Sequence, residues 1–310
     1  MKYKALKILK WTVISLLGLF TLISLLLFFN KDKICTAAID EFNTHLKVPV
    51  QISDVELTFW STFPSVSIDF KNVFIRDPYP NSSNSDTLLS VDKLSFSFNP
   101  IDIWNEDYQV KSIKVSNGSL QLKVNENGAN NYDIYKSSTN SDNEQPFNLH
   151  LNSILFSKVR FSYKNSQNKQ LYQTTLRTFE LKGDFNQKNY KLGLAGELLL
   201  NNLKSGNVSL IKNKEVSIDC FVNVDRVEDK ISIPKSIVNI SGMPFHISGD
   251  ILKDNYQLSV KANDLKFKQL IESFNHQLIN DASKLKANGD VFFDLSIKGD
   301  TDKTNAPEVV

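Results

Sequence analysis

The chain has 310 residues, with 36 lysines and arginines against 34 aspartates and glutamates, so its formal charge is nearly balanced. A nucleic-acid-binding protein is expected to carry a basic patch or stripe, and the balance argues against that class. The two cysteines, Cys35 and Cys220, lie far apart in the sequence. They are interpreted as two separate thiols rather than a bridge, and they imply no disulfide scaffold and no zinc site.

Residues 11–29 form the one uncharged apolar run that is long enough to cross a bilayer. As a helix the run would span roughly 29 Å, which matches a hydrocarbon core of about 30 Å. A cleaved signal peptide is the alternative, but its apolar region is shorter and is followed by small residues, which are missing here. A retained anchor is therefore expected, with these representative residues: Trp11, Leu16, Leu19, Leu25 and Phe29.

Lysines 2, 4, 7 and 10 precede this run, so the positive-inside rule predicts a single-pass protein with a cytoplasmic N-terminus. Three parts are then expected: a basic tip and anchor (1–30), an amphipathic helix (31–47) and an exported β-rich region (48–310). The helix is indicated by apolar residues at intervals of three and four, and it ends before Pro49. Those residues are Ile34, Ala37, Ala38, Phe42 and Leu46.

Beyond Pro49 most of the chain alternates apolar and polar residues, which is typical of strands with one apolar face. The first strand shows a one-residue slip that predicts a bulge near Asn72. The strands expected from this pattern are 66–75, 94–98, 120–124, 159–163, 190–194, 216–224, 245–247, 256–262 and 291–297.

Short polar turns at 164–169, 186–189, 212–214 and 253–255 separate these strands, which predicts an antiparallel sheet because parallel pairs need long crossovers. Residues 81–86 and 137–145 are interpreted as longer exposed loops. One late helix is expected, with Asp264 as its N-cap. Its apolar face would consist of Phe267, Leu270, Ile271, Phe274 and Leu278.

Three stretches together resemble the AsmA family of Gram-negative envelope proteins. In 55–78 an aromatic residue and Pro64 precede a strand that ends at Asp77-Pro78; in 113–134 a strand with Gly118 leads to a Gly128 turn, Asn131 and Tyr132. The third stretch, 265–299, has a helix, then Leu285, Gly289 and a strand ending in Gly299. With the anchor, the resemblance extends over nearly the whole chain. Family members are usually longer, so the chain is expected to be a truncation or the front portion of a larger protein.

The resemblance implies a bridge-like lipid-transfer protein of the bacterial inner membrane, with the bulk of the chain in the periplasm. The implied fold is mainly β: an elongated curved antiparallel sheet that forms an open groove, with the transmembrane helix and two short amphipathic helices. About fourteen strands at about 4.8 Å would make a sheet on the order of 65 Å long. Membrane lipids, phospholipid above all, are the implied partners, carried toward the outer membrane.

Apolar residues on one face of the sheet are the candidates for contact with acyl chains. They are Phe70, Phe96, Phe98, Phe161, Leu192, Ile218, Leu258 and Phe293. The same alternation also describes a sheet that covers an ordinary closed core, so the pattern alone does not decide between a groove and a core. Each acyl methylene buried in a groove would contribute about 0.8 kcal/mol.

No pattern in the sequence favours an enzyme. His45, His150, His246 and His276 lack metal-ligand spacing and are expected at the surface or at helix ends, and nucleotide-binding and nucleophile motifs do not occur. No cofactor, metal or catalytic residue is therefore expected. Two hypotheses remain: a protein that shields or transfers lipid in an open groove, and an anchored β-scaffold for envelope assembly that carries no lipid.

Overall fold

The computed structural model describes residues 36, 39–40, 43–44, 46–58, 64–79, 86–104, 109–134, 136, 151–184, 188–206, 208–253, 255–273, 289–300 and 308–309. The expected anchor, 11–29, lies outside these residues. No helix in the described part of the chain is long and apolar enough to span a membrane. Within the expected helix 31–47, the described residues 36, 39, 40, 43 and 44 are helical, and Leu46 is buried.

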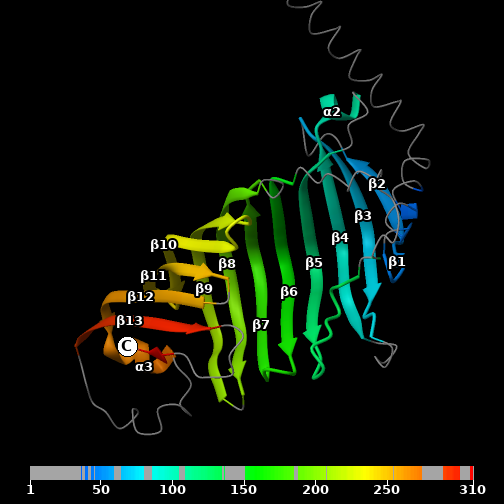
Figure 1. Cartoon of the computed structure of the whole chain (residues 1–310). Coiled ribbons are helices and arrows are strands. Elements are labelled where there is room, and N and C mark those ends of the chain that lie inside the picture. The colour runs from blue at the N-terminus through cyan, green and yellow to red at the C-terminus, as the bar shows by residue number, and fades with distance from the viewer. Residues whose placement is uncertain are drawn as a thin grey trace, which may run out of the picture.

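The described strands join into one sheet of fourteen strands (Figure 1). They are β1 (Val50–Gln51), β2 (Asp54–Thr58), β3 (Val66–Arg76), β4 (Thr87–Phe98), β5 (Val110–Val124), β6 (Ser153–Asn165), β7 (Gln170–Lys182), β8 (Asn189–Ser205), β9 (Val208–Asp225), β10 (Lys230–Ile240), β11 (Met243–Leu252), β12 (Asn255–Lys266), β13 (Asp290–Asp300) and β14 (Glu308–Val309). The sequence pattern had indicated nine of them and missed β1, β2, β7, β10 and β14.

From β3 to β14 each strand pairs with the next one in the sequence, and β1 and β2 both pair with β3. These pairs are antiparallel as predicted, with one exception: β5 and β6 are parallel. The main architecture is antiparallel as predicted, but this step makes the described sheet a mixed one. The cause is the long connection 125–152, after which β6 begins at the same end of the sheet as β5. The loop predicted at 137–145 lies outside the described residues.

The sheet curves along its length: in Figure 1 β3–β7 are nearly vertical, whereas β10–β13 are nearly horizontal. Five consecutive strands, β3 to β7, share one irregularity that accompanies this curvature. In each, two apolar residues that face the same side are three positions apart instead of two. The pairs are Phe70 and Val73, Val91 and Leu94, Val115 and Gly118 (the glycine standing in for an apolar residue), Phe156 and Val159, and Leu176 and Phe179.

The residues skipped at these points include Asn72, Asn117 and Lys158, which have φ values of 49°, 54° and 55°. The irregularity predicted near Asn72 is therefore present, but it is not a bulge. The pairs Lys71–Lys93 and Val73–Val91 keep the same register, because β4 contains a matching slip opposite Asn72. The slips of neighbouring strands are aligned by register, and they form a crease across the sheet.

Two predicted turns, 164–169 and 253–255, are confirmed by the strand ends at Asn165, Gln170, Leu252 and Asn255. Of the turn predicted at 186–189, residues 186 and 187 lie outside the described residues, and Asn189 begins β8. The turn predicted at 212–214 is wrong, because β9 runs through it and Lys212 pairs with Asn202. The part of β9 before Val216 pairs with β8 only, because its pairing with β10 begins at Val216. Polar side chains are tolerated there because one edge of the strand has no β10 residues beside it.

Beyond the helical residues before Leu46, the described part of the chain has two further helices beside the sheet. They are α2 (Pro100–Trp104), which the sequence pattern did not indicate, and α3 (Phe267–Ser273). The prediction of Asp264 as the N-cap is wrong. Asp264 lies within β12 with a φ of 56°, and the first residue of α3, Phe267, donates its N–H to the carbonyl of Gly289 at 3.1 Å. Leu270 packs on the sheet as expected; the side chain of Ile271, and Phe274 and Leu278, lie outside the described residues.

Candidate functional site

One face of the sheet, here named the apolar face, carries two rows of side chains that run from strand to strand. In the first row each residue is the register partner of the next, from β3 to β11. The row consists of Val73, Val91, Gly118, Val159, Leu176, Leu198, Val216, Ile240 and Met243. Because partners in register point to the same side of a sheet, nine strands contribute to one continuous apolar line.

The second row follows the first on the other side of the crease. It consists of Phe70, Leu94, Val115, Phe156, Phe179, Gly196, Ile218, Val238 and Phe245. One residue of each row packs against two of the three buried clusters of the described residues. In the second row this residue is Phe156. In the first row it is Ile240. The apolar face is therefore continuous from β2 to β13.

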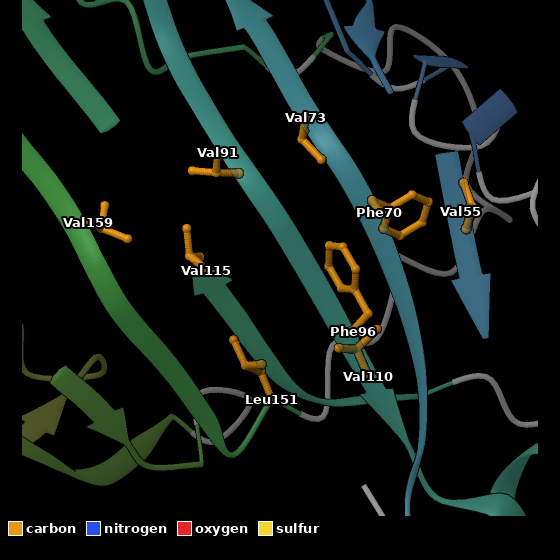
Figure 2. Packing of buried hydrophobic residues seen from close by; sticks show 9 residues of the cluster. All are labelled: Val55, Phe70, Val73, Val91, Phe96, Val110, Val115, Leu151 and Val159. Carbon is orange, nitrogen blue, oxygen red and sulfur yellow. The ribbon is translucent and has the colours of Figure 1, made fainter. Parts of the chain in front are cut away.

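The apolar face is closed at its N-terminal end. Figure 2 shows the buried side chains of this region, which come from β2 to β6 and from Leu151 just before β6, with Phe70 and Phe96 side by side. Their rings meet edge to face with centroids 5.6 Å apart. Ile39, Val50 and Ile52 pack over the same cluster, and Phe70 is only 2% exposed. This part of the face is a conventional hydrophobic core.

Toward β8–β13 the apolar face is more accessible. Leu192, Leu194, Cys220 and Val222 are half-buried, and so are the corresponding residues of β12 and β13. α3 covers one stretch of this region, where Leu270 packs near Met243 and Leu265. The part of the face available to a ligand is thus the section between the N-terminal core and α3.

All eight candidate residues from the sequence lie on the apolar face, but the structure separates them. Phe70 and Phe96 are buried in the N-terminal core, and Phe98 packs against it. Phe161 and Ile218 belong to the middle section, and Phe293 packs beside α3 with its ring 6.5 Å from that of Phe245. Leu192 pairs with Val222, and Leu258 with Ile297.

The sequence pattern missed most of the first row, including Leu176, Leu198, Ile240 and Met243. These residues do not follow strict alternation of apolar and polar positions. On β7 the crease interrupts the alternation. On β10 a register shift between Ile233 and Ser236 interrupts it. A search for an apolar residue followed by two polar residues and another apolar residue would have found β7. The same spacing recurs on β12, where Ala262 and Leu265 are both buried.

On the opposite face near the N-terminal end, a buried carboxylate lies among polar side chains. Asp69 accepts hydrogen bonds from Lys93 Nζ at 2.6 Å, Ser67 Oγ at 2.9 Å and Thr58 Oγ1 at 3.0 Å. Burial by itself would raise the pKa of Asp69, but the hydrogen bonds from Lys93, Ser95, Ser67 and Thr58 outweigh it and lower the pKa. The group therefore stabilises the packing of β2, β3 and β4 and is not poised for proton transfer at neutral pH.

Two of the three stretches that resemble the AsmA family meet in a second polar cluster. Asn131 donates from Nδ2 to Oδ2 of Asp77, and the same oxygen is 2.8 Å from Lys123 Nζ. Asn131 also bonds Lys123 through both its backbone and its side chain, and Asp77 accepts from the N–H of Tyr79. Both Asp77 and Asn131 are buried. These motif residues thus fasten the start of the crossover to the ends of β3 and β5.

The remaining candidates from the sequence are placed only in part. Cys220 is a free thiol on the apolar face, and Cys35 lies outside the described residues. His246 pairs with Lys261 on the polar face and is half-buried rather than at the surface, with its Nδ1 atom buried and without a partner among the described residues. His45, His150 and His276 lie outside the described residues.

Comparison with known families identifies the chain. The family model described as "AsmA family" matches residues 1–198, which include the first two stretches quoted above but not the third, 265–299. The expected resemblance over nearly the whole chain is therefore established only for this part. No match was found among curated proteins or among solved structures. Because the match covers more than half of the sequence, the protein belongs to the AsmA family, a membership that points to an envelope-associated, lipid-related role.

Proposed function

We propose that the apolar face shields the acyl chains of phospholipids, and that the protein does so in the periplasm while anchored in the inner membrane by residues 11–29. The observation that supports this most directly is the continuity of the two rows across nine strands. A ligand that extends over many strands needs such a strip, whereas a compact ligand would need a single pocket. Each methylene that leaves water on this strip contributes about 0.8 kcal/mol.

The accessible section of the face is the expected contact site. Phe161, Ile218, Leu258 and Phe293 lie in or beside it, whereas Phe70 and Phe96 are already buried by protein and are not expected to contact lipid. In this proposal the protein needs no cofactor and performs no catalysis. The anchor would hold the sheet at the membrane from which lipid is taken, and transport would lead toward the outer membrane.

Photo-crosslinking tests this assignment with controls that the chain itself provides. A photoreactive phenylalanine analogue is placed at Phe161 or Phe293, and the full chain is irradiated in its membrane. Phe221 is 43% exposed and alternates with Cys220 and Val222 of the apolar face. Phe292 is 71% exposed and alternates with Val291 and Phe293, so both rings point away from that face. The controls therefore carry the same analogue on the opposite face of the same or a nearby strand.

Lipid adducts at positions 161 and 293, detected as a mass increase, with none above background at 292 and 221, would support the proposal. Equal labelling on both faces, or none on the apolar face, would contradict it. That result would favour the second hypothesis, an anchored scaffold, for which the closed N-terminal core offers some support because it shows that part of this face is ordinary protein interior.

A further inference from the structure

The accessible section of the apolar face ends in a further row of side chains, here named the margin row, where β8 begins and β9 ends. Each residue of this row is the register partner of the next, from β8 to β12. The row consists of Tyr190, Val224, Ile231, Ile251 and Tyr256. It lies two positions beyond Leu192 and Val222 of the accessible section, on the same face of the sheet. The margin row is therefore the last part of this face before the sheet edge at β8 to β12.

A tyrosine stands at each end of the margin row. Both Tyr190 and Tyr256 are half-buried, and the ring of Tyr256 lies over Gly299 of the neighbouring strand. A ring that is apolar in body and polar at its tip prefers the boundary between hydrocarbon and water. The two ends of the row thus carry side chains that are suited to such a boundary.

A positively charged side chain lies over one of these two rings. The guanidinium carbon of Arg226 is 5.3 Å from the centre of the Tyr190 ring. Arg226 is exposed in the turn between β9 and β10, and its backbone N–H donates to the carbonyl of Lys188 at 2.9 Å. Because Tyr190 belongs to the apolar face by register, this contact holds the cation at the margin of that face.

A second cation lies over a ring of the same two strands, but on the opposite face. Lys191 follows Tyr190 on β8, and its Nζ atom is 4.2 Å from the centre of the Phe221 ring. Phe221 alternates with Cys220 and Val222, so this pair points away from the apolar face. The two pairs are the same kind of contact on different faces, and Lys191 therefore provides a matched control for Arg226.

The charges around Arg226 leave its guanidinium group available to an anion. Among the described residues, Arg226 takes part in no ion pair. The neighbouring Asp225 alternates with Val224 and so points to the opposite face, where its Oδ1 atom accepts two backbone N–H groups of the turn at 2.9 and 3.0 Å. Exposed residues of both charges lie at the same edge: Lys188, Glu228, Asp229 and Lys253. The surroundings thus favour neither a net positive nor a net negative headgroup.

A local stabilising contact is the ordinary explanation for an arginine over an exposed ring. The position of this pair at the end of an accessible apolar strip favours a further role. Gly196 of the second row lies six positions after Tyr190 on β8, or about 20 Å away. One acyl chain spans about 15 Å, because two leaflets share a hydrocarbon core of about 30 Å. A lipid with its phosphate at Arg226 would therefore lay its acyl chains along Leu192 and Leu194, toward the second row.

We propose that Arg226, held over Tyr190, binds the phosphate group of a phospholipid whose acyl chains lie on the accessible section of the apolar face. The inference rests on the proposed function and deepens it, because it assigns the headgroup to one edge of the sheet and makes phosphate the recognised group. The planar donors of arginine suit phosphate oxygens, and a ring beneath the guanidinium group limits its motion. Phosphatidylethanolamine and phosphatidylglycerol should then bind alike, and both should bind better than diacylglycerol.

The test uses the purified full chain in neutral detergent. It is incubated with mixed micelles of equal parts phosphatidylethanolamine, phosphatidylglycerol and diacylglycerol that have identical acyl chains, isolated again, and the bound lipids are counted by mass spectrometry. The test variant is Arg226→Gln, and Arg226→Lys is the conservative variant. The matched control is Lys191→Gln, which removes one positive charge from the ring contact on the opposite face.

The wild-type chain is expected to enrich both phospholipids severalfold over diacylglycerol. Arg226→Gln should lose this enrichment and keep its total bound lipid within about twofold, because the acyl chains still hold the lipid. Arg226→Lys should keep part of the enrichment, since the charge remains, and Lys191→Gln should keep all of it.

Three results would overturn the headgroup assignment alone: equal binding of diacylglycerol by the wild type, enrichment of only one phospholipid, or equal losses in Arg226→Gln and Lys191→Gln. Binding of none of the three lipids would overturn the proposed function, and the headgroup assignment with it.

Discussion

Asn131 and Asp77, which are 54 positions apart in the sequence, share a buried hydrogen bond of 3.3 Å between Nδ2 and Oδ2. Each belongs to one of the stretches that carry the family resemblance. Neither side chain is on the apolar face; together with Lys123 they hold the first residues of the crossover against the sheet. Two motif positions of the sequence thus have a structural role, whereas the surface proposed to meet lipid is built from residues with no motif at all.

Asn131→Ala is expected to lower the free energy of unfolding by about 2–3 kcal/mol. The substitution leaves the buried Asp77 carboxylate with fewer partners and leaves the N–H of Lys123 and the carbonyl of Gln121 without their side-chain bonds. Urea unfolding followed by circular dichroism measures the change. Asn127→Ala, an exposed position in the adjoining turn, is the control and should shift stability by less than about 0.5 kcal/mol. Equal effects of the two substitutions would contradict the role given to Asn131.

Asp69 predicts how stability depends on acid pH. Its pKa is lower in the folded protein than the ordinary value of 3.8, so between these two values the unfolded chain binds more protons. The stabilisation from Asp69 is therefore complete above the ordinary pKa and is lost as the pH falls through the folded-state pKa. Urea titrations at several pH values should show a smaller loss of stability below pH 4 for Asp69→Asn than for the wild type. An unchanged slope in the variant would show that other carboxylates govern acid unfolding.

Gly196 interrupts the second row between Phe179 and Ile218, and substitution there should be costly. Its φ is +153°, and a Cβ atom would lie 2.2 Å from the carbonyl oxygen of Thr178 and 2.7 Å from the Cα of Phe179. Backbone atoms of a paired strand cannot move away easily, so Gly196→Ala should destabilise by about 2 kcal/mol or more. Thermal unfolding of both variants measures the difference: Ala195→Ser, next to Gly196 and exposed on the other face, should be nearly neutral.

The two phenylalanines Phe70 and Phe292 allow one substitution to be compared in two environments. Phe70→Ala removes a ring that is 2% exposed and packs edge to face on Phe96, and it should cost about 3–5 kcal/mol. Phe292→Ala removes a ring that is 71% exposed and should change stability by less than about 0.5 kcal/mol. Chemical denaturation of both variants provides the comparison. A large loss for Phe292→Ala would mean that its side chain is covered in the native protein.

Alternation of apolar residues was sufficient to predict the β class and nine strands, because period two is a local property of the chain. It failed where the period changed. β7 was missed because Leu176 and Phe179 are three residues apart, and β10 because Pro234 and Lys235 interrupt its apolar positions. The parallel step between β5 and β6 was not predicted either, since the direction of a strand depends on where a long connection brings the chain.

The sequence predicted which residues lie on the apolar face, but not which of them are buried in the core and which are accessible. Local sequence indicates that Phe96 and Phe161 point to the apolar side of their strands. It does not indicate that Phe96 belongs to a buried cluster against which Ile39, Val50 and other residues of distant segments pack, while Phe161 lies in the more open section. Burial by distant segments is a tertiary property, so the distinction between core and exposed strip had to come from the structure.

The parallel pairing of β5 with β6 has a consequence for how the chain folds. From β6 to β12, each strand is joined to the next by a short reversal, so these contacts close over few residues and form early. The β5–β6 ladder forms only after the ends of segment 125–152 come together, which carries a larger loop-closure entropy. The sheet is therefore expected to assemble as two meanders, one on each side of this ladder. Their union should be the slow step and should precede the alignment of the two apolar rows.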